Sequence, residues 1–533
     1  MFAIVGAVLF IAFLFWRARA RRAKRAKRAD YNTLRGARMV AAAKLASMIK
    51  EPARLDIGGV PIPYSVENRG LLLSGAPGTG KSAAITRMLD VISTGARDFG
   101  FVADRSGICT ARYYNPARDV ILNPLDGRAS AWSPLAEIRD EWDCETIAKA
   151  IVPDAPGESG EWNRYAQIIL SAILLRVWRR RGDNGEVLRL AQQADMEELA
   201  ACFAGTAAIG LLQNDKMFGS IRGIVSTYTA GFARLDPAGG CDAFSIKAFV
   251  QKAATGGGRF MFFNYASDQL KALRRVIATM ADIFADAVMV LPPAEHKRRA
   301  WLVLDEFASL GRIESMENFL TNSRKYGGAA ILGMQSIAQI HALYSRDNAT
   351  AMLSSIGTQL VLRTSDPETA EYHSKAFGDR QILRTNRSGG GSSSAGGDSA
   401  HENWSQQVTT ERLILPADLL TLPNLAGFLK LAGSLPAAPL LLPIPSARKP
   451  AAASFERSAR LAQLEAGAPQ LADALPPGLL PADDADADQT VQAGDHQAAD
   501  DAHAQAGTAT DDDAHADHQA ADDQADDLEP LEF

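Results

Sequence analysis

The stretch that decides the fold is residues 69–92, which read RGLLLSGAPGTGKSAAITRMLDVI. Arg69 to Ser74 predict a short buried strand, and Ala83 to Ile92 have the spacing of a helix. Between them lies a complete G-x-x-x-x-G-K-S phosphate loop, in the strand–loop–helix context that such a loop requires. The residues that we expect to bind phosphates are Gly75, Ala76, Pro77, Gly78, Thr79, Gly80, Lys81 and Ser82.

The loop has the chemistry of a nucleotide site. Its glycines permit backbone angles that direct successive N–H groups at phosphate oxygens, and the start of the following helix adds the positive end of its dipole. Lys81 supplies a charge to the β and γ phosphates, and Ser82 offers its hydroxyl to Mg²⁺. We therefore expect ATP and Mg²⁺ to bind here. A glycine turn that only caps a helix would not need a buried strand directly before it and a helix directly after it.

A second half of such a site follows at residues 300–306, which read AWLVLDE. Four apolar residues before the acids predict a buried parallel strand, and ligands bind at the carboxyl ends of such strands. Asp305 would hold Mg²⁺, and Glu306 would orient and deprotonate the attacking water. Alone, the pattern fits a strand that ends in a solvated loop equally well. The phosphate loop makes the functional interpretation the better one.

Further strands are expected at 99–103, 259–264, 329–333 and 359–362, with helical stretches between them. This alternation predicts an α/β fold with a mostly parallel sheet of the phosphate-loop type. Gln335 follows one of these strands and could position water or sense the γ-phosphate. Arg324 could act as an arginine finger for a neighbouring subunit. From the residues alone, a strand-end glutamine and a surface arginine are the simpler interpretations.

Residues 133–240 interrupt the sheet pattern and carry few strand signals. We predict an inserted all-α domain there, inside a nucleotide-binding domain formed by 51–132 and 241–445. Basic residues of the insert could contact phosphates, although a charge run is usually a solvated face. They are Arg176, Arg179, Arg180, Arg181, Lys216 and Arg222.

The N-terminus begins with an unbroken apolar run, Phe2 to Trp16, followed by eight Lys and Arg residues before residue 29. This order predicts a short membrane anchor at 1–16 and a basic juxtamembrane segment at 17–50, with the chain beyond it in the cytoplasm. Fifteen helical residues span only ~22 Å of a ~30 Å hydrocarbon core. The anchor is therefore short and could be incomplete.

The charge is divided unevenly along the chain. Residues 1–460 hold all 56 Lys and Arg with 43 Asp and Glu, a net charge of +13, whereas the residues after 460 carry −19. We predict a disordered acidic tail at 446–533 that ends in a possible docking peptide at Phe533, and a flexible surface loop at 388–397. The four cysteines are scattered, which argues against a disulfide framework or a zinc cluster and fits a reducing compartment.

Several motifs together indicate a known family. They are GAPGTGKS at 75–82, ILNPLDGR at 121–128, LVLDEFASLGRI at 302–313, LTNSRKYGG at 320–328, GMQSIAQI at 333–340 and ERLILP at 411–416. This combination resembles the type IV secretion coupling proteins of conjugation, the TraD and TrwB group. The resemblance covers about residues 55–435, and the motifs around Asp305 and Arg324 are far more specific than the phosphate loop.

The resemblance implies an ATPase of the bacterial inner membrane, of the FtsK-like translocase class, that forms a hexameric ring. It would recruit a relaxase bound to DNA, with a relaxosome accessory protein, and move single-stranded DNA into the secretion channel. It also implies catalytic roles for Glu306, Arg324 and Gln335. Family members usually have two transmembrane helices, whereas this chain shows one short apolar run.

Two other functions remain open. The chain could be a double-stranded DNA translocase of the FtsK type, or a docking receptor that recruits substrates and hydrolyses little ATP. A membrane protease is disfavoured because no H-E-x-x-H motif is present: His401 and Glu402 continue as Asn-Trp-Ser.

Overall fold

The computed structural model describes residues 31–256, 259–294, 298–394, 397–446, 448–459 and 461. The predicted anchor at 1–16 and the acidic stretch that ends at Phe533 lie outside these residues. Within the part of the chain that is described, no helix is both long enough and apolar enough to span a bilayer.

A nine-stranded sheet forms the centre of the fold, in the order β14-β13-β10-β4-β9-β8-β5-β7-β6. All neighbours from β10 to β6 pair in parallel, and β13 and β14 are antiparallel. The predicted, mostly parallel α/β sheet is thereby confirmed. The strands are β4 (Leu71–Ser74), β5 (Asp98–Arg105), β6 (Val120–Ile121), β7 (Phe260–Tyr265), β8 (Arg299–Leu304), β9 (Gly328–Met334), β10 (Thr358–Leu362), β13 (Ala426–Lys430) and β14 (Ala438–Leu441).

Strand order places the predicted site. Strand β9 lies between β4, which precedes the phosphate loop, and β8, which precedes Asp305. Because parallel strands end at the same edge of a sheet, three polar segments meet there. They are the phosphate loop, the Asp305–Glu306 pair and Gln335.

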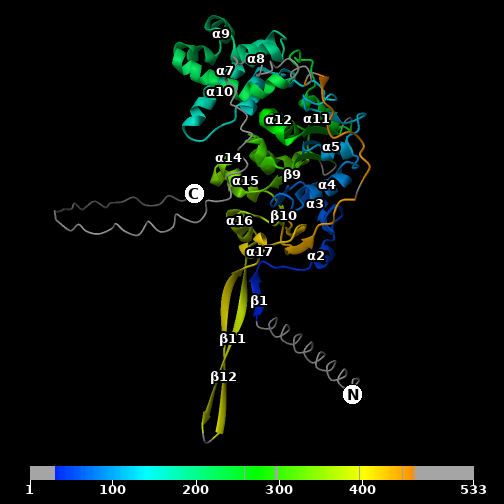
Figure 1. The fold of residues 1–533 in the computed structure, drawn as a ribbon, viewed down its shortest axis with the longest axis vertical. Helices are drawn as coiled ribbons and strands as arrows, with labels where there is room; N and C mark the ends of the chain where they lie inside the picture. Colours follow the sequence, from blue (N-terminus) through cyan, green and yellow to red (C-terminus); the bar gives the residue numbers. More distant parts are fainter. Residues whose placement is uncertain are drawn as a thin grey trace, which may run out of the picture. The chain divides into compact units, whose positions relative to one another are not determined.

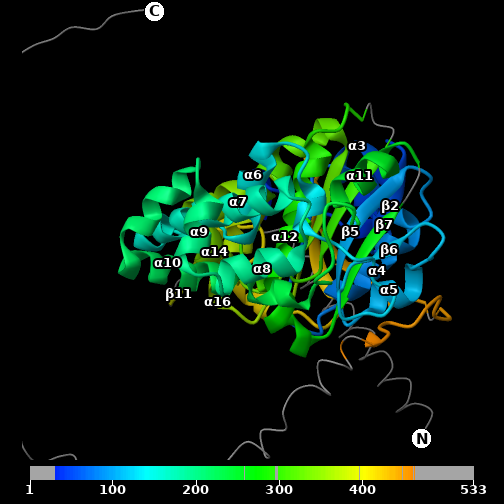
Figure 2. The ribbon, with the colours of Figure 1, turned by 90° about the horizontal axis from the view of Figure 1, so that it is seen from above.

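Apolar side chains alternate between the two faces of the sheet, and both faces are covered. Leu72 and Leu302 belong to one hydrophobic cluster, whereas Leu71, Leu73 and Val303 belong to the other. Burial on both faces explains why the strands read as continuous apolar runs. Helices α4 (Lys81–Ile92) and α5 (Ile108–Tyr113) cover one face (Figure 2), and α12 (Ser267–Met289) packs on the other.

The remaining helices of the sheet region are short. They are α2 (Ala42–Met48), α3 (Tyr64–Glu67), α11 (Ile246–Ala254), η4 (Phe307–Leu310), α13 (Met316–Asn322), η5 (Ser323–Tyr326), α14 (Ile337–Tyr344), α15 (Arg346–Ser354), α16 (Pro367–Phe377) and α17 (Pro416–Leu420). A separate two-stranded sheet consists of β2 (Ala53–Ile57) and β3 (Val60–Pro63).

Residues 134–234, all of which the structure describes, form helices and no strand. Their elements are η1 (Pro134–Glu137), α6 (Glu141–Ile151), α7 (Glu158–Arg179), α8 (Asn184–Gln192), α9 (Met196–Phe203), η2 (Ala207–Gln213), α10 (Asp215–Thr229) and η3 (Ala230–Arg234). Figure 1 shows α7 to α10 together at one end of the sheet region. Their core is continuous with that of α12, since Ile173 and Leu273 share one cluster. The domain limits at 133 and 240 stay a prediction.

A long hairpin projects from the body beside the N-terminal strand (Figure 1). It consists of β11 (Asp379–Ser394) and β12 (Gly397–Arg412), and β1 (Tyr31–Gly36) pairs with β11. The prediction of a flexible loop at 388–397 is wrong for 388–394 and 397, which are paired strand residues. The antiparallel register set at the base of the hairpin continues through the glycines, although glycine itself disfavours strands.

The segment before the acidic tail packs on the body. The N–H of Ala451 donates to the carbonyl of Ala111 at 2.7 Å, and the N–H of Ser458 donates to the carbonyl of Leu125 at 3.0 Å. The predicted start of a disordered tail at 446 is therefore too early, because backbone groups at 451–458 have partners in the folded body.

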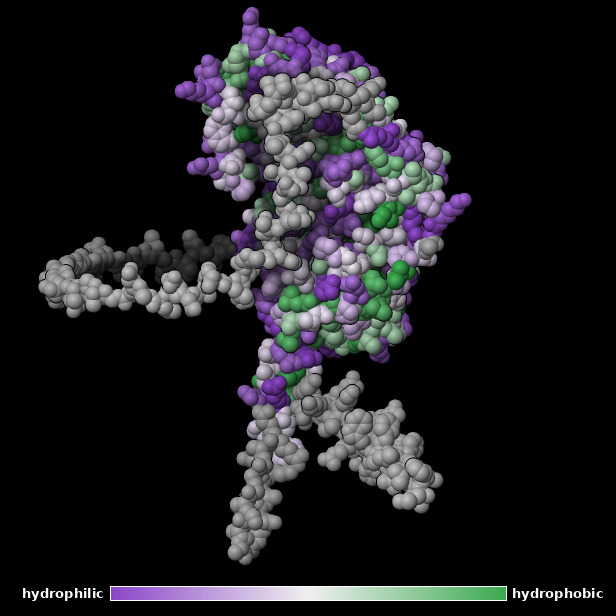
Figure 3. Space-filling view, in the orientation of Figure 1, coloured by the Kyte–Doolittle hydropathy of each residue, from purple (hydrophilic) through white to green (hydrophobic). Residues whose placement is uncertain are grey.

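The surface in view is unevenly apolar (Figure 3). Hydrophilic residues dominate the helical end, and apolar side chains gather near α2. Helix α2 contacts β14, and exposed apolar residues of this region include Met48, Leu441 and Ile444.

Candidate nucleotide-binding site

The phosphate loop has the backbone conformation that its glycines predict. Gly78 and Gly80 have φ angles of 73° and 118°, in the left-handed region that glycine tolerates best. At Gly75, a Cβ atom would lie 2.8 Å from Thr79 Oγ1 and 2.9 Å from Leu362 Cβ. Helix α4 begins directly after the loop at Lys81, so its free N–H groups lie beside the loop.

Neighbouring strands hold the loop from three sides. The N–H of Gly75 donates to the carbonyl of Met334, and the N–H of Ala76 donates to the carbonyl of Arg363. The N–H of Leu425 donates to the carbonyl of Thr79 at 3.0 Å. The loop is therefore preorganised by the ends of β9 and β10 and by the segment before β13.

Lys81 is buried at the base of the loop. Its Nζ donates to the carbonyls of Gly75 at 2.5 Å and Ala76 at 3.1 Å. Burial lowers the pKa of Lys81, while the carboxylates of Asp305 and Glu306 oppose this shift. A poorly hydrated ammonium group held in this position suits a phosphate ligand.

Ser82 and Asp305 form a pair with the donor set for Mg²⁺. The Ser82 hydroxyl donates to Asp305 Oδ2 at 2.8 Å. The other oxygen, Asp305 Oδ1, is buried and has no hydrogen-bond partner. A hydroxyl beside a carboxylate with unused lone pairs fits a hard cation, which prefers oxygen ligands.

Glu306 is contacted on both carboxylate oxygens. Gln335 Nε2 donates to Oε1 at 2.5 Å, and the Arg105 guanidinium forms an ion pair with Oε2. The sequence predicted Glu306 and Gln335 as separate site residues without pairing them, and Arg105 was missed. Arg105 ends the strand that lies next to β8. The sequence alone does not show which strands are neighbours, so this position could be recognised only from the strand order.

These side chains surround one cavity of about 350 Å³. It is lined by Pro77, Gly78, Gly80, Lys81, Ser82, Ala83, Arg105, Ser106, Ile108, Asp305, Glu306 and Gln335. The structure thus brings together most of the predicted phosphate-binding residues with Asp305, Glu306 and Gln335. Such an arrangement can hold a nucleotide triphosphate with Mg²⁺ and present a base to water.

Arg324 lies elsewhere. It is exposed on η5, immediately before β9, whereas Gln335 follows the other end of the same strand. Seven strand residues separate the two ends by ~23 Å. Arg324 therefore lies far from the nucleotide site of its own chain.

Residues 54–443 match the family model described as the type IV secretion-system coupling protein DNA-binding domain. The chain belongs to the type IV secretion coupling proteins. It is 26% identical to coupling protein TraD of Escherichia coli K12 over 411 residues, 75% of this chain and 56% of TraD. It is also 26% identical to VirD4 of Agrobacterium fabrum over 281 residues, 50% of this chain and 40% of VirD4. The chain spans about half the length of these curated relatives.

Solved structures of the conjugative coupling protein TrwB are similar to this chain throughout the described body. The unbound form, TrwBdeltaN70, is 28% identical, with a TM-score of 0.71 over 80% of this chain and 97% of the solved chain. TrwB in complex with a non-hydrolysable ATP analogue gives the same identity and TM-score, over 80% of this chain and 98% of TrwB. A further TrwB structure contains ADP and Mg²⁺, with a TM-score of 0.70. The resemblance inferred from the motifs is confirmed.

The motif at 121–128 has a structural role in this coupling protein. Asp126 is buried and accepts hydrogen bonds from Arg128 and from Asn264 Nδ2 at 2.7 Å. The N–H of Gly127 donates to the carbonyl of Glu456. The motif therefore joins the end of β7 to the segment at 451–458.

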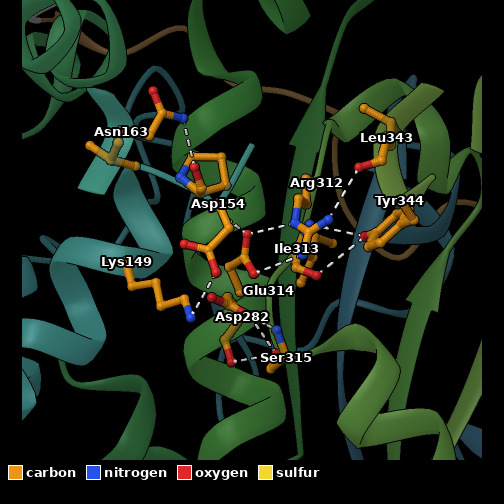
Figure 4. Close-up of polar contacts among 12 residues, drawn as sticks. Lys149, Asp154, Asn163, Asp282, Arg312, Ile313, Glu314, Ser315, Leu343 and Tyr344 are labelled. Atoms are coloured by element: carbon orange, nitrogen blue, oxygen red, sulfur yellow. Dashed lines mark hydrogen bonds and ion pairs between the residues drawn. The ribbon is translucent and has the colours of Figure 1, made fainter. Parts of the chain in front are cut away.

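A polar cluster links the coupling protein's helical insert to the segment after Glu306 (Figure 4). Glu314 Oε1 accepts from the N–H of Asp154 and from Arg312 Nε, both at 2.7 Å. Arg312 Nη1 also donates to the carbonyl of Leu343 on α14. Residues 312–314 thus contact the insert and the helix that follows Gln335.

Two of the insert's predicted phosphate contacts are paired within the chain. Arg179 forms an ion pair with Glu141, and Arg181 forms one with Asp242 at 2.8 Å. Lys216 is exposed. A role in DNA contact stays a prediction for all six basic residues.

Gly333 is a further residue that sequence reasoning missed. A Cβ atom there would lie 1.6 Å from the carbonyl oxygen of Asp305, so β9 and the end of β8 approach too closely for any side chain. A glycine inside an apolar strand was the available signal.

Proposed function

We propose that this coupling protein is an ATP-driven DNA transfer motor of a bacterial inner membrane. It recruits a relaxase–DNA complex and moves single-stranded DNA into a type IV secretion channel during conjugation. Family membership and the geometry around Glu306 support this proposal. The observation that carries it is the convergence of Lys81, Ser82, Asp305, Glu306 and Gln335 on one cavity.

The chemistry of hydrolysis follows from these residues. Glu306 accepts a proton from water as the water oxygen bonds to the γ-phosphorus, and the bond to the β,γ-bridging oxygen breaks. Gln335 orients Glu306 and the water, and Lys81 stabilises the charge that develops on the phosphate oxygens. Ser82 and Asp305 would hold Mg²⁺, which neutralises phosphate charge when bound.

The proposal also covers the assembly of the chain, its domains and its partners. The assembly is a homo-hexameric ring in which Arg324 completes the nucleotide site of the next subunit. The nucleotide-binding domain comprises 51–132 and 241–445, and 133–240 is the inserted all-α domain. Residues 1–16 anchor the chain in the membrane, and the acidic tail with Phe533 docks a relaxosome accessory protein.

Substitution of Lys81 tests the proposal. Lys81→Ala should abolish ATP hydrolysis, because it removes the charge at the β and γ phosphates, while circular dichroism stays unchanged. Lys44→Ala, which changes an exposed lysine of α2, is the matched control and should hydrolyse ATP normally. Normal phosphate release by Lys81→Ala would overturn the ATPase assignment.

A further inference from the structure

Arg105 lines the nucleotide cavity, and the nucleotide chemistry above does not use it. It ends strand β5, next to β8, and its guanidinium pairs with Glu306 Oε2. The glutamate side chain is 13% exposed and the arginine side chain 36%. The pair is therefore partly shielded from solvent, where such contacts are stronger than on an open surface.

This ion pair opposes the role of Glu306 as a base. A general base needs a free lone pair aimed at the proton of the attacking water. One carboxylate oxygen of Glu306 accepts from Gln335, and the other is occupied by Arg105. In this arrangement both oxygens accept a hydrogen bond, and the contacts with Gln335 and Arg105 fix the direction in which the carboxylate faces.

Arg105 also contacts the first turn of α12. Its Nη2 donates to Ser267 Oγ at 3.2 Å, and Nε lies 3.4 Å from the same oxygen. Ser267 is the first residue of the helix. One guanidinium thus bridges Glu306 and the start of α12.

Helix α12 connects this end to the helical insert. Arg275 Nη2 donates to the carbonyl of Ala150 at 2.6 Å, and Thr279 Oγ1 donates to the same carbonyl at 3.1 Å. Ala150 lies in the last turn of α6. A displacement of the insert would therefore act on α12, and through Ser267 on Arg105.

We propose that Arg105 is a positioning residue that restrains Glu306 until the insert engages DNA. Movement of α12 then draws the guanidinium from Glu306 Oε2, and the freed oxygen accepts the proton of the attacking water. This inference rests on the proposed ATPase function and deepens it, because it explains how DNA would stimulate turnover.

The test compares ATP turnover of the full chain with and without a single-stranded oligonucleotide. Arg105→Gln should raise unstimulated kcat about threefold or more, leave the stimulated kcat near the wild-type value and change KM for ATP less than about twofold. Arg105→Lys, which keeps the charge, should lie between the two. Arg87→Gln is the matched control: it removes an exposed ion pair between Arg87 on α4 and Asp56 on β2 and should behave like wild type.

The outcomes separate this inference from the proposed function. A fall in kcat for Arg105→Gln, with ATP binding retained, would mean that Arg105 contacts the phosphates. Unchanged kinetics would mean that Arg105 does not restrain Glu306. Either result overturns the inference and leaves the proposed ATPase function intact. Absence of turnover in every chain would overturn both. If Arg105→Gln fails to fold, Ser267→Ala replaces it and should lower the stimulation ratio at unchanged KM; an unchanged ratio overturns the inference.

Discussion

At the scale of single residues, His373 on α16 is fully buried, and neither of its ring nitrogens has a hydrogen-bond partner. The Tyr372 ring stands edge-on to it at 5.1 Å between centroids. Burial lowers the pKa of His373 to about 3, so the folded protein holds the neutral imidazole.

This shift predicts a specific dependence of stability on pH. The unfolded chain protonates His373 near pH 6.5, whereas the folded chain does so only near pH 3. Stability contributed by the neutral ring is present above pH 6.5 and falls as the pH drops toward 3, by up to about 1.4 kcal/mol per pH unit. Between pH 7 and pH 5, His373→Leu should therefore lose about 2 kcal/mol less than wild type in urea unfolding. Equal losses in the two chains would contradict this account.

Most of the candidate site could be predicted from the sequence, because motif spacing fixes residues that follow each other along one strand end. Lys81, Ser82 and Asp305 belong to this group. Arg105 and Gly333 do not, since their importance depends on which strands become neighbours. The sequence does not show which strands lie beside β5 and β9. The contacts of Arg105 and Gly333 with the Asp305–Glu306 segment could therefore not be predicted.

At the scale of elements, the segment 311–315 joins three parts of the fold. It follows η4, contacts the insert through Glu314, and reaches α14 through Tyr344, whose hydroxyl accepts from the N–H of Ile313 at 3.0 Å. Ser315 closes the segment on α12, where its N–H donates to Asp282 Oδ1 at 2.7 Å. The helical insert, α14 and α12 are thus all bound to the segment 311–315, which follows Glu306 closely in the chain.

Glu314→Gln should weaken this junction. It leaves the partly buried Arg312 without a carboxylate partner, which costs about 1–3 kcal/mol. Asp154→Asn is the matched control. Glu314 binds the backbone N–H of Asp154, whereas the hydrogen-bonded partners of the Asp154 side chain are Gln167 and exposed Lys149. Thermal unfolding should show a lower Tm for Glu314→Gln than for Asp154→Asn. A lower Tm for the control would refute the importance of this contact.

Element prediction succeeded where burial dictates pattern and failed where pairing overrides composition. The strands around Leu72 and Leu302 read as apolar runs because both faces are covered. Residues 388–394 read as a linker from their glycines and serines, yet they continue a hairpin whose register is set at its base. Similarly, 451–458 carries no strong pattern and is ordered by backbone bonds to the body.

At the scale of the whole molecule, the charge is divided between a basic body and an acidic tail. The body's excess of +13 includes the eight cations before residue 29, which leaves a modest +5 for 29–460. A weak excess suits transient contacts with a moving phosphate backbone, because strong binding would resist release. The −19 after residue 460 would repel DNA and attract a basic protein.

The position of Arg324 predicts complementation between subunits. Arg324→Ala and Glu306→Gln chains should each be inactive alone, because every site lacks one group. Mixed in equal amounts, they should recover turnover at about a quarter of the interfaces, those that join an intact Glu306 to an intact Arg324. Phosphate release from the mixture measures this recovery. A mixture as inactive as its components would argue against a role in trans.

The central claim is that Glu306 serves an ATP-driven motor that single-stranded DNA stimulates, and ATP hydrolysis by the full chain tests it most directly. The measurement compares wild type with Glu306→Gln, each without DNA, with a single-stranded oligonucleotide and with its duplex. We predict the largest stimulation by the single strand, and a loss of about 100-fold or more in Glu306→Gln with nucleotide binding retained. Stronger stimulation by the duplex would favour a double-stranded DNA translocase. Equal hydrolysis by the two chains, or wild-type hydrolysis that no DNA stimulates, would contradict the account.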